Sequence, residues 1–392
     1  MPATQKLYET DATLRRFYAR VLDCCQKMDS AYAVLLDRTA FFPEGGGQGA
    51  DHGLLGGVPI TDVHEKQGEV WHTAAAPLAV GAFVEGVVDG VRRDDLTVQH
   101  SGEHIVSGLI HRYYGFHNVG FHLGSDVVTI DFDGILTPAE LSDIELAANL
   151  YVREDHPVQI LLPTREELSR LDYRSKKEIA GQVRIVRFPE ADTCACCGTH
   201  VARTGEIGLI RLLSVQRFRS GCRIEMLSGA RAFSYLARME AQNRRISALL
   251  SAKPAETADA VERLLHELSR QKAQIAHLQS EHFAQLAARF SGDADALLFE
   301  PDLDADAVRR LCAALLDATT GLCAVFSGDD DAGYKYALGQ RGGDIRTLTR
   351  QLNAALSGRG GGRDPFFSQG SVHAAEPAIR AFFAARGQAS EN

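Results

Sequence analysis

The sequence lacks the features that mark membrane, secreted and strongly basic proteins. It has no run of about 18 apolar residues and no apolar signal-peptide core at its N-terminus, which predicts a chain without membrane association. Its eight cysteines are not spaced as a disulfide framework and therefore predict a reducing, cytoplasmic compartment. A net charge of −9 argues against a general nucleic-acid binder.

The order of short patterns along the 392 residues predicts an α+β protein with four parts. Residues 1–93 hold short apolar runs separated by glycine or proline, which is typical of a small β-barrel-like domain. Residues 94–232 mix helix and strand patterns and predict an α/β domain. Residues 233–290 carry two apolar helical stripes separated by Pro254, which predict a helical hairpin or short coiled coil. This linker packs either on its own domain or at a dimer interface.

Residues 291–392 predict a last α/β domain, which is rich in glycine. Its segment Gly358–Arg363 is expected to be a flexible loop between a helix over 345–356 and a strand, and it matches neither a Walker loop nor a Rossmann fingerprint. Between Lys335 and Arg386 the chain has eight cationic and three acidic side chains. Such a basic stretch can meet a phosphate backbone even on an acidic protein, or simply solvate a surface.

Two short motifs almost a hundred residues apart supply the ligands of a zinc site. The first is His100-Ser-Gly-Glu-His104, which lies in a pattern that predicts a helix capped at Asp94, Asp95 or Thr97 and ended by Gly115. Residues at i and i+4 share one face of a helix, so both histidines can reach one ion. The second motif, Cys196-Cys-Gly-Thr-His200, is expected to be a tight turn running into a short helix. Three imidazoles and one thiolate form a complete tetrahedral zinc set, with one zinc per chain.

Two other interpretations of these motifs stay open. Two histidines at i and i+4 are often ordinary surface or core residues that bind no metal. Cys194 and Cys197 are poorly spaced for a second metal site and can be ordinary buried residues. His100-x-x-Glu103-His104 also matches the inverted zinc-protease pattern, in which Glu103 would be the general base. That chemistry needs an open coordination position, which Cys196 and His200 would fill.

Several segments together resemble the editing region of alanyl-tRNA synthetases and its free-standing relatives, the AlaX-type alanyl-tRNA editing proteins. They are Thr39-Ala-Phe-Phe-Pro-Glu-Gly-Gly-Gly-Gln48, the two zinc motifs, Gly120-Phe-His-Leu-Gly-Ser125 and Arg223-Ile-Glu-Met-Leu-Ser-Gly229. The helical linker and Ala355-Leu-Ser-Gly-Arg-Gly-Gly-Gly-Arg363 are similar to the C-terminal domain of those synthetases. Nearly the whole chain is covered, as in the long AlaX type.

The resemblance implies an aminoacyl-tRNA hydrolase that acts in trans. The partner would be tRNA for alanine mischarged with serine or glycine, and zinc would assist the hydrolysis of its ester. Because the barrel-like segment starts within the first few dozen residues, we expect no aminoacylation domain and no charging of tRNA. The alternatives are a non-catalytic, zinc-stabilised tRNA-binding protein and, less favoured, the H-x-x-E-H metalloprotease. A homodimer through residues 233–290 or the C-terminal domain is a further expectation.

The resemblance also implies roles for individual residues. Thr39 would recognise the serine hydroxyl, because relatives have a threonine there and a buried partner group discriminates well against a substrate that lacks the hydroxyl. Gln48 and His122 would line the pocket or position water, and Glu103 would orient a zinc ligand. Arg359 and Arg363 would contact tRNA phosphates. The chain departs from the family at His122, where the synthetases commonly have Gln, and at Cys197, which replaces a usual Gly; these departures leave the amino-acid selectivity open.

Overall fold

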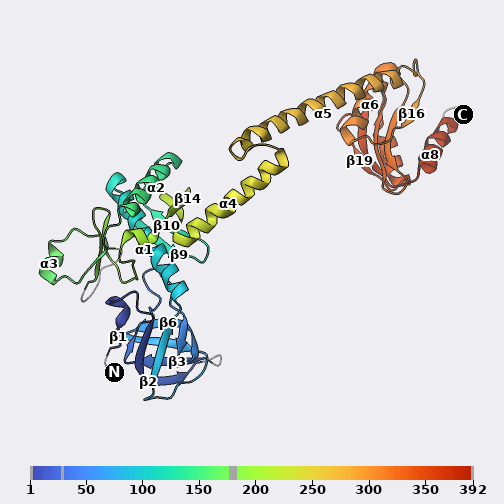
Figure 1. The fold of residues 1–392 in the computed structure, drawn as a ribbon. Coiled ribbons are helices and arrows are strands. Elements are labelled where there is room, and N and C mark those ends of the chain that lie inside the picture. The colour runs from blue at the N-terminus through green and yellow to red at the C-terminus, as the bar shows by residue number, and fades with distance from the viewer. Residues whose placement is uncertain (1–2, 28–30, 176–182, 390–392) are drawn as a thin grey trace. The chain divides into compact units, whose positions relative to one another are not determined.

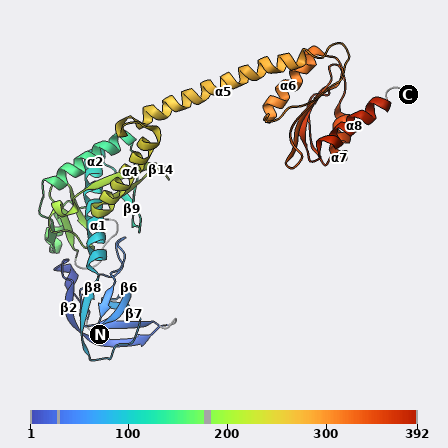
Figure 2. The ribbon, with the colours of Figure 1, turned by 45° about the vertical axis from the view of Figure 1, so that its right-hand side comes forward.

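The computed structural model describes residues 3–27, 31–175 and 183–389, and the chain divides into two compact units. Unit 1 comprises residues 1–244 and unit 2 residues 245–392 (Figures 1 and 2), and each unit is described by itself. Within the described ranges, no helix is long and apolar enough to cross a membrane. The predicted α+β class is confirmed, because both units combine helices with sheets.

Unit 1 begins with a closed six-stranded β-barrel. Along its longest strand, β2, Phe17, Ala19 and Val21 are buried while their neighbours are not, as period-two alternation requires. The barrel core is apolar and includes Val34 and Phe41. Two short strands, β1 (Gln5–Lys6) and β4 (Arg38–Thr39), pair in parallel beside it. In the order in which they pair, the barrel strands are β2 (Arg16–Gln26), β3 (Tyr32–Leu36), β7 (Glu69–Ala74), β6 (Val58–Lys66), β5 (Gly53–Leu55) and β8 (Phe83–Val88).

Helix α1 (Gly90–Tyr114) follows the barrel and forms the centre of the next domain. Its N-cap is Asp89, whose side chain accepts a hydrogen bond from the backbone of Arg92, so the predicted caps further along the chain are wrong. The predicted end is confirmed, because Gly115 has the left-handed φ of 72° that glycine adopts freely. The buried guanidinium of Arg93 is paired with the buried carboxylate of Asp51, which ties the start of α1 to the barrel.

Two sheets and a second helix surround α1. Helix α2 (Pro138–Arg153) starts with a capping box between Thr137 and Glu140, and it packs with α1 against a four-stranded antiparallel sheet. A three-stranded sheet lies next to α1 through β13. The first sheet has the order β14 (Ile210–Phe218), β15 (Gly221–Ser228), β10 (Val128–Phe132), β9 (Asn118–Leu123); the second has the order β11 (Gln159–Leu161), β12 (Ile185–Phe188), β13 (Asp192–Ala195). A short helix, α3 (Arg165–Ser169), follows β11.

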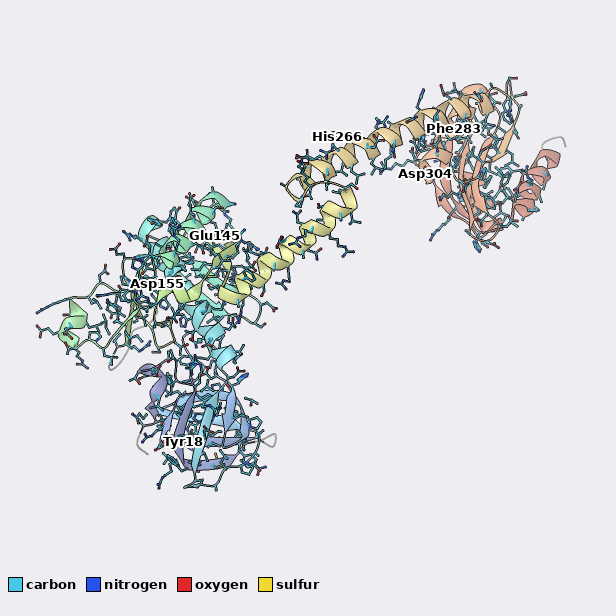
Figure 3. The ribbon with its side chains drawn as sticks, viewed as in Figure 1. Tyr18, Glu145, Asp155, His266, Phe283 and Asp304 are labelled. Carbon is cyan, nitrogen blue, oxygen red and sulfur yellow. The ribbon has the colours of Figure 1, made fainter. Side chains whose placement is uncertain are left out.

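Two long helices occupy the segment predicted as a helical linker. Helix α4 (Gly229–Leu250) crosses the boundary of the two units, and α5 (Thr257–Ala287) follows a short turn. The end of α5 packs on helix α6 (Ala305–Ala318) and the C-terminal sheet through Phe283 and Leu286, and Phe283 is labelled in Figure 3. Leu264, Leu268 and Ile275 of α5 are exposed. The dimer through residues 233–290 or the C-terminal domain stays a prediction.

The C-terminal part of unit 2 is a five-stranded sheet with helices on both faces. Residues Val325 and Ala337 face α6 and the end of α5, and Phe326 and Leu338 face α7 and α8. The predicted flexible loop after α7 is wrong in part, because Arg359–Gly361 forms the edge strand β19. The sheet order is β16 (Ala296–Phe299), β17 (Cys323–Asp329), β18 (Gly333–Gly339), β20 (Phe367–Val372), β19; the helices are α6 (Ala305–Ala318), α7 (Arg346–Ala355) and α8 (Glu376–Ala389).

Candidate metal centre

The structure brings the four predicted zinc ligands together in unit 1. His100 and His104 lie one turn apart on α1, and Cys196 and His200 come from the loop after β13. One ligand atom from each residue lies within 4.8 Å of the others, and the three imidazoles are buried. The predicted short helix at Cys196–His200 is wrong, because these residues form an irregular loop and a 3-10 turn follows only at Thr204–Ile207.

The atoms that would bind a metal have the spacing of a tetrahedral zinc site. The sulfur of Cys196 lies 3.5 Å from Nε2 of His100 and 3.4 Å from Nε2 of His200. Zinc bonds of about 2.3 Å to sulfur and about 2.0 Å to nitrogen, at a tetrahedral angle, place those atoms about 3.5 Å apart. The residues present therefore fit zinc in both chemistry and spacing.

Each imidazole is oriented by a hydrogen bond at its other ring nitrogen. Nδ1 of His100 lies 2.9 Å from Oε1 of Gln48, and Nδ1 of His104 lies 2.7 Å from Oδ2 of Asp192. Nδ1 of His200 lies 3.4 Å from the hydroxyl oxygen of Ser101. Because Gln48 Oε1 and Asp192 Oδ2 can only accept, they assign the proton to Nδ1 and leave Nε2 with a lone pair for a metal.

The charges around the cluster suit a thiolate ligand. Burial alone would raise the pKa of the Cys196 thiol, but His100 and His200 outweigh it and hold that pKa well below its usual range. Burial would also raise the pKa of Asp192, whereas His104 and Arg174 lower it to about 2. Arg174 donates to both oxygens of this carboxylate, at 2.7 and 2.8 Å. The thiolate and the carboxylate are thus the charged forms that a zinc site needs.

The cluster opens onto a cavity of about 400 Å³. His100, His104 and Cys196 form part of its wall, together with Phe121 and Glu103. The ring of Phe121 stacks on His100 with centroids 5.2 Å apart. The other lining residues are Gly46, Gly47, Arg174, Ser175, Cys194, Ala195 and Cys197.

A glycine in the second motif lets the loop approach α1. A Cβ atom at Gly198 would lie 2.2 Å from the His100 ring, a distance that side chains essentially never reach. Cys197 precedes it and lines the cavity with an exposed side chain. The cavity therefore has a second thiol on its wall, beside the candidate ligand Cys196.

The structure places the other predicted site residues at different distances from the metal ligands. Gln48 contacts the candidate ligand His100 directly. Glu103 lines the cavity and accepts hydrogen bonds from Asn118 at 2.6 Å and Ser107 at 2.7 Å. Thr39 is fully buried, and its hydroxyl lies 2.8 Å from Nε2 of His72 and accepts from the backbone of Phe41. It does not line the cavity.

His122 is exposed on β9 and is not part of the cavity wall. Its neighbour Phe121 lines the cavity instead, because successive side chains of a strand point to opposite faces. Arg359 and Arg363 lie in unit 2 and are exposed. The functional roles predicted for these residues stay predictions.

Sequence reasoning missed Asp192, Arg174 and Phe121. Asp192 lies on β13 two residues before Cys194, and a carboxylate close to a ligand motif is the usual partner of a metal-bound imidazole. That signal was available in the sequence. Arg174 and Phe121 carry no comparable signal, because only the packing of distant segments brings them to the site.

The comparisons with known proteins agree with this site. Residues 183–225, which include Cys196 and His200, match the family described as the threonyl and alanyl tRNA synthetase second additional domain. The chain is 32% identical over 396 residues to an alanine–tRNA ligase of Halorubrum lacusprofundi, covering 94% of this chain and 42% of the ligase. It is 34% identical over 240 residues to the alanyl-tRNA editing protein Aarsd1-A of Xenopus laevis, covering 60% of this chain and 58% of that protein.

Residues 183–225 are thus similar to a domain of threonyl- and alanyl-tRNA synthetases, and the chain spans between about two fifths and three fifths of the length of these relatives. The resemblance drawn from its motifs is confirmed: the matched synthetase domain and the relatives named alanine–tRNA ligase and alanyl-tRNA editing protein support an AlaX-type alanyl-tRNA editing protein.

Proposed function

We propose that this chain hydrolyses the ester of tRNA for alanine that carries serine or glycine. The water oxygen bonds to the carbonyl carbon, the bond from that carbon to the ribose oxygen breaks, and a proton passes to the ribose oxygen. The observation that carries this proposal is the cluster of three oriented imidazoles and one thiolate, of which His100, His104 and Cys196 line a cavity of about 400 Å³. A cavity of this size admits an aminoacyl group.

His100, His104, Cys196 and His200 would hold one zinc ion. When bound, zinc would supply a positive charge, and the substrate's amino group or terminal ribose would be positioned against it so that the ester lies beside a water molecule. Gln48 and Asp192 keep His100 and His104 in the tautomer that this ion requires. Phe121 stacks on His100 and forms an apolar part of the cavity wall.

We propose that Thr39 influences selectivity for serine indirectly, by positioning the backbone that leads to the site. Its hydroxyl holds the backbone of Phe41, at the start of the segment that leads to Gly46, Gly47 and Gln48 at the site. The Thr39→Val variant removes this hydrogen bond and should reduce the preference for serine over alanine while zinc stays bound. Unchanged selectivity, measured as the ratio of kcat/KM for the two esters, contradicts this role.

A non-catalytic, zinc-stabilised tRNA-binding protein is the second candidate function. The four ligands favour it, because a complete set of protein ligands is typical of structural zinc. The same four ligands disfavour the H-x-x-E-H metalloprotease, which needs an open position. The protease predicts that Cys196→Ala keeps its metal and that Glu103→Gln abolishes peptide cleavage, whereas our proposal predicts loss of zinc in Cys196→Ala.

The deciding experiment is a deacylation assay with tRNA for alanine charged with serine, glycine or alanine. We expect the zinc-loaded chain to release serine or glycine faster than the zinc-stripped chain and faster than Cys196→Ala, and to spare the alanyl ester. Asp155→Asn, a change at an exposed ion pair, is the matched control. Tight tRNA binding without hydrolysis above the zinc-stripped level would establish the non-catalytic function instead.

A further inference from the structure

The hairpin formed by β14 and β15 in unit 1 carries a cluster of cations at its tip. We define the tip as residues 216–223, whose sequence contains three arginines and no acidic residue. Arg217 and Arg219 are exposed, and neither forms an ion pair with another residue in the described ranges. Arg223 is paired with Asp131 on β10. The tip therefore has a positive charge that the proposed function does not use.

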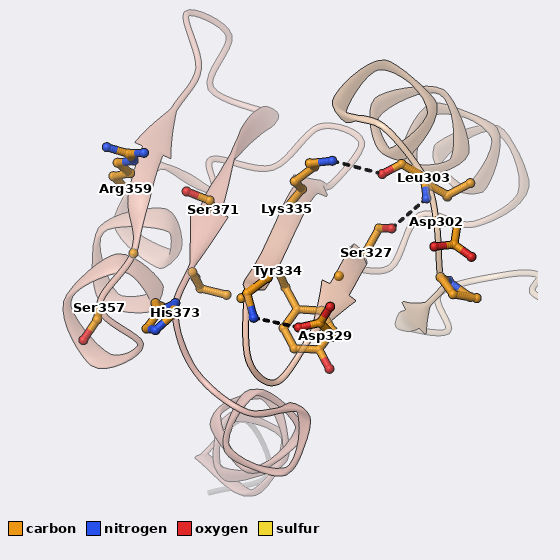
Figure 4. A pocket seen from close by; sticks show the side chains of 16 residues that line it. Asp302, Leu303, Ser327, Asp329, Tyr334, Lys335, Ser357, Arg359, Ser371 and His373 are labelled. Carbon is orange, nitrogen blue, oxygen red and sulfur yellow. Dashed lines mark hydrogen bonds between the residues drawn. The ribbon is translucent and has the colours of Figure 1, made fainter.

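The tip differs in charge from other cationic surfaces of the protein. Several exposed arginines elsewhere in unit 1 are neutralised by carboxylates: Arg16 pairs with Glu85, Arg170 with Glu166 and Arg203 with Asp155. The cavity of about 900 Å³ in unit 2 has both charges on its wall, and Figure 4 shows them. They belong to Asp302, Asp329, Lys335 and Arg359. At the hairpin tip, two exposed guanidiniums have no such acidic partner in the described part of the chain.

The backbone of the tip holds these side chains in a fixed place. Phe218 pairs with Gly221, so only two residues form the loop between the strands. A Cβ atom at Gly221 would lie 1.9 Å from the backbone oxygen of Phe132, which shows that the tip packs directly on the end of β10. The guanidinium of Arg219 lies 5.1 Å from the centroid of the Phe218 ring. This contact orients the guanidinium and leaves its charge in place.

The conformation of Arg219 favours a different residue. Its φ is 53°, in the left-handed region that glycine adopts freely and that other residues adopt only at a cost. The fold alone therefore favours glycine at this position. Because strained residues often lie at functional sites, the side chain of Arg219 is a candidate for a functional contact.

The strand register relates the tip to the cavity of the candidate metal centre. Phe121, which lines the cavity, lies in one row of the sheet with Ile130, Ile224 and Val215. Phe218 lies three residues beyond Val215 on β14, which is about 10 Å at about 3.3 Å per residue. Across the sheet, β14 is three strand spacings of about 4.8 Å from β9. The tip thus lies roughly 17 Å from Phe121, a distance that a few nucleotides of RNA span.

Exposed arginines without acidic partners suit phosphate groups, because one guanidinium can donate to two phosphate oxygens. Contacts of this kind position a nucleic acid without reading its sequence. We propose that the tip of the β14–β15 hairpin binds phosphates in the acceptor arm of the tRNA through Arg217 and Arg219, while the aminoacyl group occupies the cavity. This inference rests on the proposed function and adds to it a binding site in unit 1, outside the cavity.

The test is the binding of an uncharged tRNA transcript to the full chain, measured over a range of salt concentrations. Arg217→Gln and Arg219→Gly should each weaken binding roughly threefold to tenfold, the expected effect of losing one charged hydrogen bond at an exposed site. Each should also lower the salt slope by about 1. Arg165→Gln is the matched control, because Arg165 is exposed and without an ion pair among the described residues but lies on α3.

Arg219→Gly separates a contact with RNA from a structural role. Because glycine suits a φ of 53°, this variant should keep its melting temperature while its affinity for tRNA falls. The inference is overturned if the tip variants bind tRNA as Arg165→Gln does. It is also overturned if the affinity falls without a change in the salt slope, since a lost phosphate contact must change both.

Failure of this inference is distinguishable from failure of the proposed function, because the binding assay uses no ester. A chain that binds tRNA through the tip but hydrolyses no ester supports the inference and contradicts the proposed function. A chain that hydrolyses the seryl or glycyl ester, but whose tip variants bind tRNA normally, gives the opposite result.

Discussion

Asp192 provides the sharpest test of the candidate metal centre, because its carboxylate connects the candidate ligand His104 to the guanidinium of Arg174. It accepts from Nδ1 of His104 at 2.7 Å and from Arg174 at 2.7 and 2.8 Å, and it is buried. Asp192→Asn keeps the shape of the side chain but removes its charge and one acceptor oxygen. His104 and Arg174 must then share a single amide oxygen, so the orientation and basicity of His104 both suffer.

We expect this change to weaken zinc binding roughly tenfold to a hundredfold, the usual effect of losing the partner of a metal-bound imidazole. That range corresponds to roughly 1.4–2.7 kcal/mol of binding free energy. The assay is a competition for zinc between the protein and a chromophoric chelator at neutral pH. Asp155→Asn serves as the control, because Asp155 also pairs with an arginine, at 2.6 Å, but on the exposed surface.

The outcome that refutes the reasoning is equally concrete. If folded Asp192→Asn binds zinc as tightly as Asp155→Asn does, then Asp192 does not orient a metal ligand. If both variants lose zinc equally, the effect is general and the contact between Asp192 and His104 has no special role. A loss confined to Asp192→Asn, with an unchanged circular dichroism spectrum, supports the assigned role.

Two further predictions concern the stability of unit 1. Asp51→Ala leaves the buried guanidinium of Arg93 without its ion-pair partner and should lower the free energy of unfolding by about 3–5 kcal/mol in urea titrations. Asp94→Ala, which breaks an exposed ion pair, should lower it by no more than about 1 kcal/mol. Equal losses in the two variants would contradict the role of burial. Burial lowers the pKa of His72 to about 4 in the folded state, against about 6.5 when unfolded. The unfolded state therefore gains protons first as pH falls, and about 3 kcal/mol of stability should be lost between pH 6.5 and 4. His72→Gln should flatten this slope and His64→Gln, at an exposed site, should not.

Much of the fold and of the metal ligand set is predictable from local patterns. The strand alternation around Phe17, the i, i+4 spacing of His100 and His104, and the glycine at 115 all act over a few residues, so the sequence displays them directly. Local patterns failed where a partner far along the chain decides the outcome. The segment at Arg359–Gly361 has little strand propensity of its own, but β20 supplies its hydrogen bonds.

The sequence alone determined the candidate ligands, the helix that carries two of them and the resemblance to alanyl-tRNA editing proteins, because the preference of a metal depends on residue type and short spacing. Only the tertiary structure decided that Gln48 and Asp192 hydrogen-bond to His100 and His104 and that Phe121 lines the cavity in place of His122. The physical reason is that these contacts join segments that are distant in the chain. Strand register, which sets the face of the sheet on which each side chain lies, is fixed only when the strands pair.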